Sequence, residues 1–290
     1  MDSITLKAMA KINLGLDVVR RRPDGYHEVK MIMQMLNLYD RVYIERTERP
    51  GIVIETNLSF LPTDERNIAY KAAKLLIDEF DITDGVTIKI DKRIPVAAGM
   101  AGGSTDCAAV LFGMNRLFDL KLDRKALMER GVKLGADVPY CLMRTTALSE
   151  GIGEILTPVP PLKNCKVLVA KPAISVSTKH VYENLKLDEH TVHPDIDGIV
   201  AALEREDLKG ITDRLGNVLE TVTEAEHPII TQIKEKMMED GAAGALMSGS
   251  GPTVFGLFED DDKAEAAFAS MKASGLARQV FLTTPYVGRT

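Results

Sequence analysis

The opening segment ITLKAMAKINLGLDVV alternates apolar and other residues. The apolar residues of one parity are Ile4, Leu6, Ala8, Ala10, Ile12, Leu14, Leu16 and Val18. Because successive side chains of a strand point to opposite faces, this alternation predicts a long half-buried strand or hairpin. A Pro-Asp-Gly turn signal follows at Pro23–Gly25. The chain is therefore committed from its start to a fold that contains a sheet.

Strand and helix patterns both recur after this segment. Strand patterns occupy Arg41–Glu45, Ile52–Glu55, Val86–Ile90 and Gln279–Thr283. Helical patterns occupy Ile68–Phe80, with Asn67 as N-cap, about Asp123–Leu134, and Lys263–Ala273. The proline-rich segment Thr157–Asn164 is the best candidate for a linker. Mixed elements on both sides of it predict a two-domain α+β protein.

Composition excludes several classes of function. The chain has 290 residues and 45% hydrophobic residues, enough for one large domain or two ordinary ones. Its net charge of −6 disfavours nucleic acid as a partner. No apolar run is long enough for a membrane span, and charged residues interrupt the N-terminal segment where a signal peptide would lie. The three cysteines have neither metal-site nor disulfide spacing, so we expect free thiols in the cytoplasm.

The segment IPVAAGMAGGSTDCAAVL places three glycines and a Ser-Thr pair between a strand pattern and a helix pattern. It fits neither the P-loop nor the G-x-G-x-x-G pattern. Glycines let a backbone approach a ligand closely, and the N–H groups at a helix start attract anions. We therefore expect a phosphate-binding loop, with Ser104 or Thr105 as the cap of the following helix. The alternative is an ordinary tight turn between a strand and a helix.

This glycine segment resembles the central phosphate-binding motif of the GHMP kinases. The segments AKINLGLDVVRRRPDGYHEV and GADVPYCLMRTTALSEGIGE are similar to one branch of that family, and MSGSGPTVFGLF resembles its third motif. The resemblance covers nearly the whole chain. The sequence departs from that branch at Met100, Ala101, Thr105, Asp106 and Cys107. MRTTAL also replaces an expected glycine pair and leaves Arg144 without an assigned role.

The resemblance implies the two-domain GHMP kinase fold. It implies an N-terminal domain of the S5-domain-2-like type over residues 1–157 and a ferredoxin-like C-terminal domain over 163–290. It also implies ATP with Mg²⁺, and cytidine-diphospho-methylerythritol as the small-molecule substrate that receives the phosphoryl group. The expected oligomeric state is a monomer or a weak homodimer. The alternatives are another GHMP kinase of the homoserine or mevalonate type, and a non-catalytic nucleotide-binding protein on the same fold.

The resemblance also assigns roles to residues. Lys11 and Asp137 are the implied catalytic pair, in which a carboxylate takes the proton of the alcohol and an ammonium stabilises negative charge. The alternatives are a solvent-facing Lys11 and a turn or capping role for Asp137. The implied ATP-binding residues are Asn67, Pro95, Val96, Ala97, Ala98, Gly99, Met100, Ala101, Gly102, Gly103, Ser104 and Thr105. Asp106 either adds negative charge near the phosphates or takes part in binding magnesium.

The remaining implied residues bind the cytidine substrate. They are Asn13, Tyr26, His27, Thr178, Tyr182, Gly249 and Ser250. The aromatic rings suit stacking on a base, and the imidazole suits a hydrogen bond to its edge. The alternatives are surface positions for the tyrosines, a backbone-capping amide for Asn13 and a plain hairpin turn at Gly249. No histidine spacing predicts a metal site, and no protein ligand of Mg²⁺ is assigned.

Overall fold

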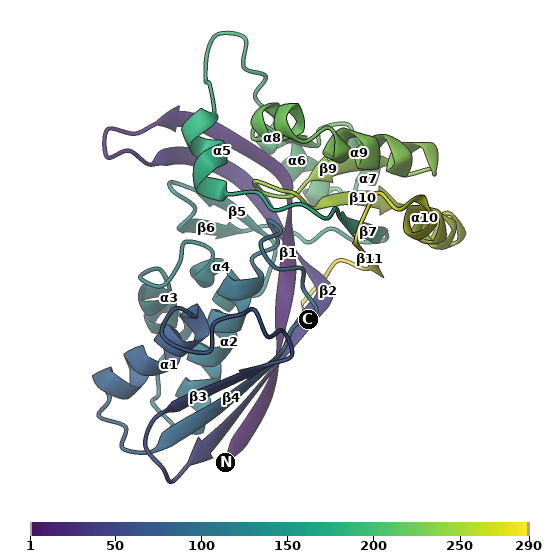
Figure 1. Cartoon of the computed structure of the whole chain (residues 1–290). Helices are drawn as coiled ribbons and strands as arrows, with labels where there is room; N and C mark the ends of the chain where they lie inside the picture. The colour runs from purple at the N-terminus through teal and green to yellow at the C-terminus, as the bar shows by residue number, and fades with distance from the viewer. Residues whose placement is uncertain (1, 289–290) are drawn as a thin grey trace. The chain divides into compact units, whose positions relative to one another are not determined.

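The computed structural model of the chain describes residues 2–288. Its helices and strands belong to two compact units (Figure 1). Unit 1 contains Met1–Ala10, Leu38–Val96 and Ala101–Arg144, and unit 2 contains Lys11–Asn37, Ala97–Met100 and Thr145–Thr290. The neighbouring strands β1 (Ser3–Arg21) and β2 (His27–Thr47) each contribute residues to both units.

Strand β1 confirms the alternation at the N-terminus, but only its first part is half-buried. Every residue from Ala8 to Val18 is buried, so the expectation of a half-buried strand is wrong beyond Lys7. The reason is that other elements cover both faces there. Gly15, for example, lies against α6 (Ile196–Glu204), where a Cβ atom would be 2.6 Å from Ile196 Cδ1. Lys11 and Asn13 therefore lie in the buried part of the strand.

In unit 1, helices pack beside a sheet (Figure 1). The end of β2 pairs antiparallel with β4 (Gly85–Asp91), and β4 pairs parallel with β3 (Ile52–Thr56). Helix α1 (Ile68–Glu79) packs along α2 (Gly102–Leu117). Helices α3 (Arg124–Gly131) and α4 (Val138–Met143) contact each other and α2. At Gly113, α2 lies so close to the sheet that a Cβ atom would be 2.4 Å from Ile44 Cδ1.

Unit 2 contains a four-stranded antiparallel sheet among its described residues. Its strand order is β11 (Gln279–Thr283), β7 (Lys166–Lys171), β10 (Val254–Phe258) and β9 (Gly244–Met247). Helices α9 (Ile229–Glu239) and α10 (Asp261–Ser274) precede β9 and β11 and contact this sheet. This order and helix placement confirm the ferredoxin-like part of the predicted α+β fold.

In the part of the chain that the structure describes, unit 2 also contains three short strands, two of which pair with β1 or β2, and four helices. Strand β5 (Ala147–Glu150) pairs with β2 at Met31–Met33 and with β6 (Ile155–Pro158). The short strand β8 (Gly216–Asn217) pairs parallel with β1. The helices are α5 (Thr178–Asn184), α6, α7 (Leu208–Thr212) and α8 (Glu220–Glu226).

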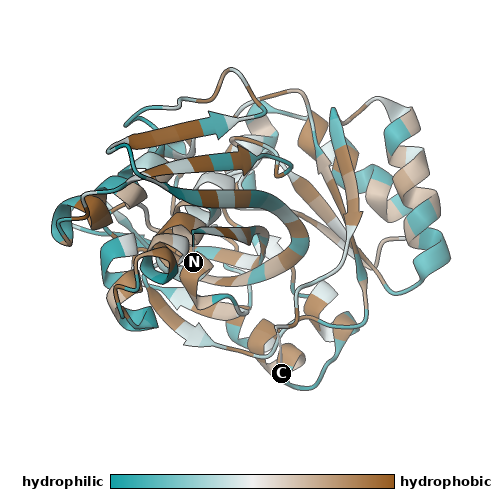
Figure 2. Cartoon of the chain, turned by 90° about the horizontal axis from the view of Figure 1, so that it is seen from below, coloured by the Kyte–Doolittle hydropathy of each residue, from teal (hydrophilic) through white to brown (hydrophobic). Residues whose placement is uncertain are grey.

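Hydrophobic residues recur along the strands, and the helices carry both hydrophobic and polar residues; the core contains residues of both kinds of element (Figure 2). Among residues 2–288, no helix is both long enough and apolar enough to span a bilayer.

Candidate active site

The glycine segment forms a loop that enters α2 without a side-chain cap. Left-handed backbone angles occur at Ala97, Gly99 and Ala101, with φ of 49°, 70° and 55°. Helix α2 begins at Gly102, so Ser104 and Thr105 lie inside it and the prediction that either caps it is wrong. The chain turns at left-handed Ala101, before it reaches either hydroxyl. The first N–H groups of the helix have no carbonyl one turn earlier, which leaves them available to an anion.

Three segments of unit 1 lie beside this helix start. The Cβ position of Gly103 is 3.6 Å from Ile68 Cδ1, at the start of α1. The Cβ position of Gly102 is 3.3 Å from Lys92 Nζ. The Cβ position of Gly135, in the GADVP segment, is 3.9 Å from Ser104 Oγ. The helix start is therefore close to the segments that carry Asn67 and Asp137.

Asn67 is the N-cap of α1, as the helical pattern predicts. Its Oδ1 accepts a hydrogen bond from the N–H of Ala69 at 3.0 Å, and its Nδ2 donates to the Pro62 carbonyl at 2.9 Å. Both ends of the amide are thus engaged in fixing the start of α1. A contact of Asn67 with nucleotide stays a prediction.

Asp137 occupies the N-cap position of α4, but its carboxylate makes no capping hydrogen bond. The position agrees with the capping alternative, whereas the side chain is not used for it. The same helix ends at Arg144, which has a left-handed backbone with φ of 56°. Glycine adopts this conformation most easily, so Arg144 stands at a position where a glycine would be favoured.

A buried charge cluster, not predicted from the sequence, joins the glycine segment to the sheet of unit 1. Lys92 Nζ donates to Asp40 Oδ2 and, at 2.6 Å, to Asp106 Oδ2. Asp40 Oδ1 also accepts the N–H of Ile94 at 2.8 Å. Because Ile94 begins the glycine segment and Asp106 lies in α2, the cluster fixes the chain on both sides of the loop.

The cluster contains one more carboxyl group than ammonium groups. Burial, with the nearby Asp40 carboxylate, raises the pKa of Asp106 to about 8, although Lys92 acts in the opposite direction. The Asp106 side chain points to Lys92, and its Oδ1 has no hydrogen-bond partner among the described residues. Only the position of Asp106, three residues after Gly103, could have indicated this cluster, because Asp40 is distant in the sequence.

In unit 2, Lys11 and Asn13 form a buried pair. Their exposed fractions are 5% and 0%, so a solvent-facing Lys11 is excluded. Lys11 Nζ donates to Asn13 Oδ1 at 2.7 Å, and the Lys11 N–H donates to the Met100 carbonyl at 3.1 Å. Lysine is rarely buried without a partner. The pair therefore places an ammonium group beside the glycine loop.

Unit 2 also brings together the glycine loop and the hairpin loop between β9 and β10. Ser248 Oγ donates to the Gly99 carbonyl at 2.9 Å. The Cβ position of Gly249 is 3.4 Å from Gly99 Cα and 3.6 Å from Asn13 Oδ1. Gly249 is thus in a hairpin turn, as the alternative states, and it also lies against the first loop and Asn13.

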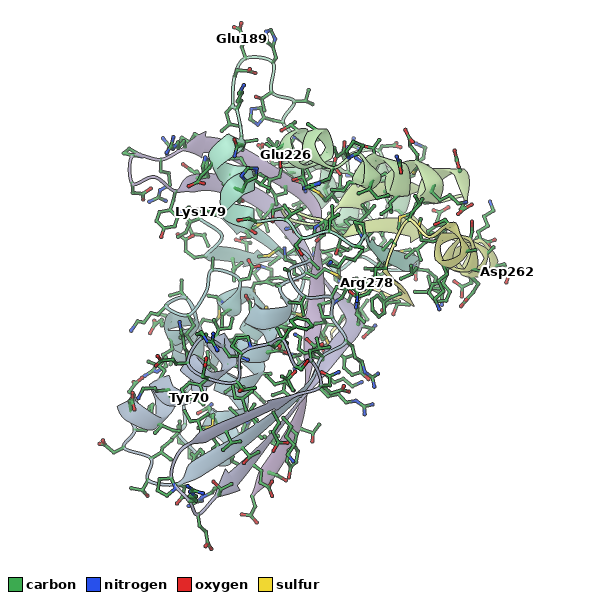
Figure 3. The ribbon with its side chains drawn as sticks, in the orientation of Figure 1. Tyr70, Lys179, Glu189, Glu226, Asp262 and Arg278 are labelled. Carbon is green, nitrogen blue, oxygen red and sulfur yellow. The ribbon has the colours of Figure 1, made fainter. Side chains whose placement is uncertain are left out.

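The hairpin loop contacts helix α5 as well. Thr178 Oγ1 and Ser250 Oγ are 2.8 Å apart and share a hydrogen bond. His180 of α5 contacts the Glu226 carboxylate of α8 at 2.9 Å. Figure 3 shows Glu226 on α8 and Lys179, the neighbour of His180, on α5. The segment that carries Thr178 and Tyr182 is therefore held beside the hairpin loop.

Two of the predicted base-binding residues are neighbours. The rings of His27 and Tyr182 are 5.1 Å apart and tilted by 39°. Burial, together with the charge of Arg21, lowers the pKa of His27 and favours the neutral imidazole. Tyr26 is 61% exposed on the turn between β1 and β2, so its ring face is accessible. A neutral imidazole has one donor and one acceptor nitrogen, which suits the edge of a base.

The chain is similar in sequence and structure to known kinases. The family models described as "GHMP kinases N terminal domain" and "GHMP kinases C terminal" match residues 67–145 and 199–276. A 4-diphosphocytidyl-2-C-methyl-D-erythritol kinase of Lachnoclostridium phytofermentans is 59% identical over 98% of this chain and 97% of its own. A crystal structure of 4-(cytidine 5'-diphospho)-2C-methyl-D-erythritol kinase has a TM-score of 0.85, with 33% identity over 98% of this chain and 100% of that chain. The homoserine kinase of Cytophaga hutchinsonii has a TM-score of 0.79 over 99% of this chain and 96% of its own; at 22% identity it shows the fold alone.

Proposed function

We infer the function from one premise: the chain belongs to the GHMP kinases and, within them, to the 4-diphosphocytidyl-2-C-methyl-D-erythritol kinase family. It is a phosphotransferase with an alcohol acceptor. We propose that it transfers the γ-phosphoryl group of ATP to the 2-hydroxyl of 4-diphosphocytidyl-2-C-methyl-D-erythritol, in the non-mevalonate route to isoprenoid precursors. The alternative functions, a GHMP kinase of the homoserine or mevalonate type and a non-catalytic nucleotide-binding protein, would be revealed by a different pattern of turnover.

One observation supports this proposal most directly. The glycine loop and the Gly249 loop meet beside the buried Lys11–Asn13 pair. Phosphoryl transfer depends on positioning and on stabilising charge, and two loops with an ammonium group supply both. Among residues 2–288 the hydrogen bond found for the Lys11 ammonium group goes to the Asn13 amide oxygen, which accepts it, and a purely structural role would not explain why a lysine with only this acceptor is buried there.

Asp137 and Lys11 are the proposed catalytic residues. An alcohol is a weak nucleophile at neutral pH, and a carboxylate within hydrogen-bond reach takes its proton as the bond to phosphorus forms. Asp137 suits this role because its carboxylate is not engaged in capping α4. The Lys11 ammonium would stabilise the negative charge that develops on the transferred group.

The segment Pro95–Thr105, with Asn67 nearby, is the proposed ATP-binding region. Its left-handed turn and the open N–H groups of α2 fit a chain of phosphates. Bound MgATP supplies the phosphoryl group and neutralises charge on the phosphate oxygens. Among residues 2–288 no group of three or more metal-ligating side chains is found. Mg²⁺ held by phosphate oxygens and water needs no such group.

The cytidine end of the substrate is assigned to unit 2. We propose that Tyr26 and Tyr182 stack on the base and that the neutral His27 hydrogen-bonds to its edge. Asn13, Thr178, Gly249 and Ser250 would contact the remaining polar groups. The adjacent rings of His27 and Tyr182 support this assignment.

Three further expectations belong to this proposal. The first is a domain boundary between residues 157 and 163; the two family models match segments on either side of it. The others are a monomer or weak homodimer and a cytoplasmic location. All three stay predictions.

The function is tested by ADP release from the purified protein with MgATP. The acceptor alcohols are 4-diphosphocytidyl-2-C-methyl-D-erythritol, homoserine and mevalonate, each in a separate assay. We expect turnover only with the first. Turnover with another alcohol would overturn the base-binding roles of Tyr26, His27 and Tyr182. ATP binding without turnover on any alcohol would favour a non-catalytic protein.

A further inference from the structure

The hairpin loop that contains Gly249 is held by two side chains from the segment GNVLE, the buried Asn217 and the half-buried Glu220. Asn217 Nδ2 donates to the Met247 carbonyl at 2.9 Å and to the Gly249 carbonyl at 2.8 Å. Glu220 Oε1 accepts the N–H of Met247 at 2.8 Å. The peptide groups at the start of the loop are therefore fixed from both sides.

These two side chains are themselves held by the body of unit 2. Asn217 lies in β8, which pairs with β1, and its Oδ1 accepts the N–H of Leu219 at 3.0 Å. Glu220 begins α8 and forms an ion pair with Lys234 of α9 at 2.9 Å. Asn217 thus fixes the position of the loop relative to β1, the strand that carries Lys11 and Asn13.

The carbonyl groups of the loop are occupied. Besides those bound by Asn217, the Ser248 carbonyl accepts the N–H of Gly251 at 3.0 Å. The Ser250 carbonyl lies 3.3 Å from Thr223 Oγ1 and shares the single hydroxyl proton with the Leu219 carbonyl, which lies at 3.2 Å. Within residues 2–288, by contrast, no hydrogen bond is found for the N–H groups of Gly249 and Ser250.

A loop with bound carbonyls and open N–H groups is a binding surface for anions. Gly249 has a left-handed backbone with φ of 59°, and successive N–H groups near such a residue can converge on one anion. The loop also lies against Asn13, whose Oδ1 accepts the Lys11 ammonium. Two N–H donors and a nearby ammonium group together suit the oxygens of a phosphate group.

We propose that Asn217 is a positioning residue for phosphoryl transfer. By binding two carbonyl groups of the hairpin loop, it directs the N–H groups of Gly249 and Ser250 to phosphate oxygens beside Asn13. This inference rests on the proposed kinase function of the same site. Asn217 itself does not touch the reacting atoms.

The test is the variant Asn217→Asp in the full-length protein. The carboxylate keeps an acceptor for the Leu219 N–H but has no donor, and its charge repels the carbonyls of Met247 and Gly249. We expect kcat per folded molecule to fall about 10- to 100-fold, because small misplacement of reacting groups has effects of this size. KM for ATP and for the cytidine substrate should change by less than about threefold, because the loop N–H groups act mainly on charge that develops during transfer and the other proposed binding residues are unchanged.

A matched control is available in unit 1. Asn115 is a buried asparagine whose Nδ2 donates to the Leu122 carbonyl at 2.9 Å and whose Oδ1 accepts the Leu122 N–H at 3.0 Å. Asn115→Asp therefore loses the same kind of bond away from the hairpin loop. It should lower Tm and leave kcat per folded molecule unchanged. Equal kcat in both variants, or a raised KM with unchanged kcat in Asn217→Asp, would overturn the proposal.

A second variant covers the case in which Asn217→Asp does not fold. Thr223→Val conserves shape but removes the hydroxyl whose proton the Ser250 and Leu219 carbonyls share. We expect a smaller fall in kcat, about threefold to tenfold, again with little change in KM. Wild-type kcat in this variant would contradict the proposal. Absence of turnover in the wild-type protein would instead refute the kinase function, so the two failures are distinguishable.

Discussion

Replacing Gly99 by alanine tests whether contact between the two loops controls catalysis. A Cβ atom at Gly99 would lie 2.1 Å from the Ser248 carbonyl oxygen, which is 1.3 Å less than the 3.4 Å at which ordinary contact begins. The neighbouring backbone must therefore move by about 1 Å, because the obstacle is not a flexible side chain. Overpacking of this kind costs about 1–3 kcal/mol. The left-handed backbone, with φ of 70°, costs alanine about 1–2 kcal/mol more.

The displacement should affect turnover as well as folding. A shift of about 1 Å between reacting groups lowers rates by about 100-fold, so we expect kcat to fall by that order. Gly275→Ala is the matched control. Gly275 has φ of 73°, nearly that of Gly99, but within residues 2–288 no heavy atom beyond its own and its chain neighbours' lies within 4 Å of its Cβ position. The control carries the backbone cost without the collision.

The assay is steady-state ADP release for both variants, together with thermal unfolding of each. Gly275→Ala should lower Tm modestly and keep wild-type kcat. Gly99→Ala should lower Tm further and lose most of its turnover. If both variants have similar kcat per folded molecule, the contact between Gly99 and Ser248 does not position the site, and the reasoning is refuted.

Three other variants test separate parts of the site. Asp106→Asn removes the carboxyl group whose pKa burial raises to about 8. In the wild-type protein the free energy of unfolding should fall as pH rises from about 4 to 8, because only the folded protein keeps the Asp106 proton in that range. The variant should lose this dependence, and the same slope of Tm against pH in both proteins would contradict the reasoning. Asp137→Asn should lower kcat about 10²- to 10⁴-fold with little change in Tm, since no capping bond is lost, and near-normal turnover would exclude Asp137 as the base. Tyr26→Ala should raise KM for the cytidine substrate by an amount that corresponds to about 1–3 kcal/mol of lost stacking free energy, and it should leave KM for ATP unchanged. Tyr26→Phe, which keeps the ring, is the control. Equal effects on the KM values of both substrates would exclude stacking.

Local patterns predicted the elements of this fold well. The alternation at Ile4–Val18 and the helical spacing at Ile68–Phe80 correspond to β1 and α1, and Asn67 caps α1 as expected. These features depend on residues close together in the sequence. The fold class followed from the order of such elements and from the family motifs.

Features that depend on distant residues were not predicted. The partners Asp40 and Asp106 approach Lys92 only when the sheet and α2 are in place. Asn217 likewise binds a loop that is remote in the sequence. The capping prediction for Ser104 and Thr105 was wrong because residue type alone does not show that Ala101 turns left-handed first.

The close packing of α2 against the sheet at Gly113 affects the other end of the helix. Eleven residues separate Gly113 from Gly102, which in a helix is a rigid arm of about 16 Å. A larger side chain at Gly113 would collide with Ile44 and Leu6 and lift the whole arm from the sheet. The N–H groups at its other end would move with it. A bulky residue at position 113 would therefore displace the end of the helix that we propose binds phosphate, although position 113 itself does not contact that site.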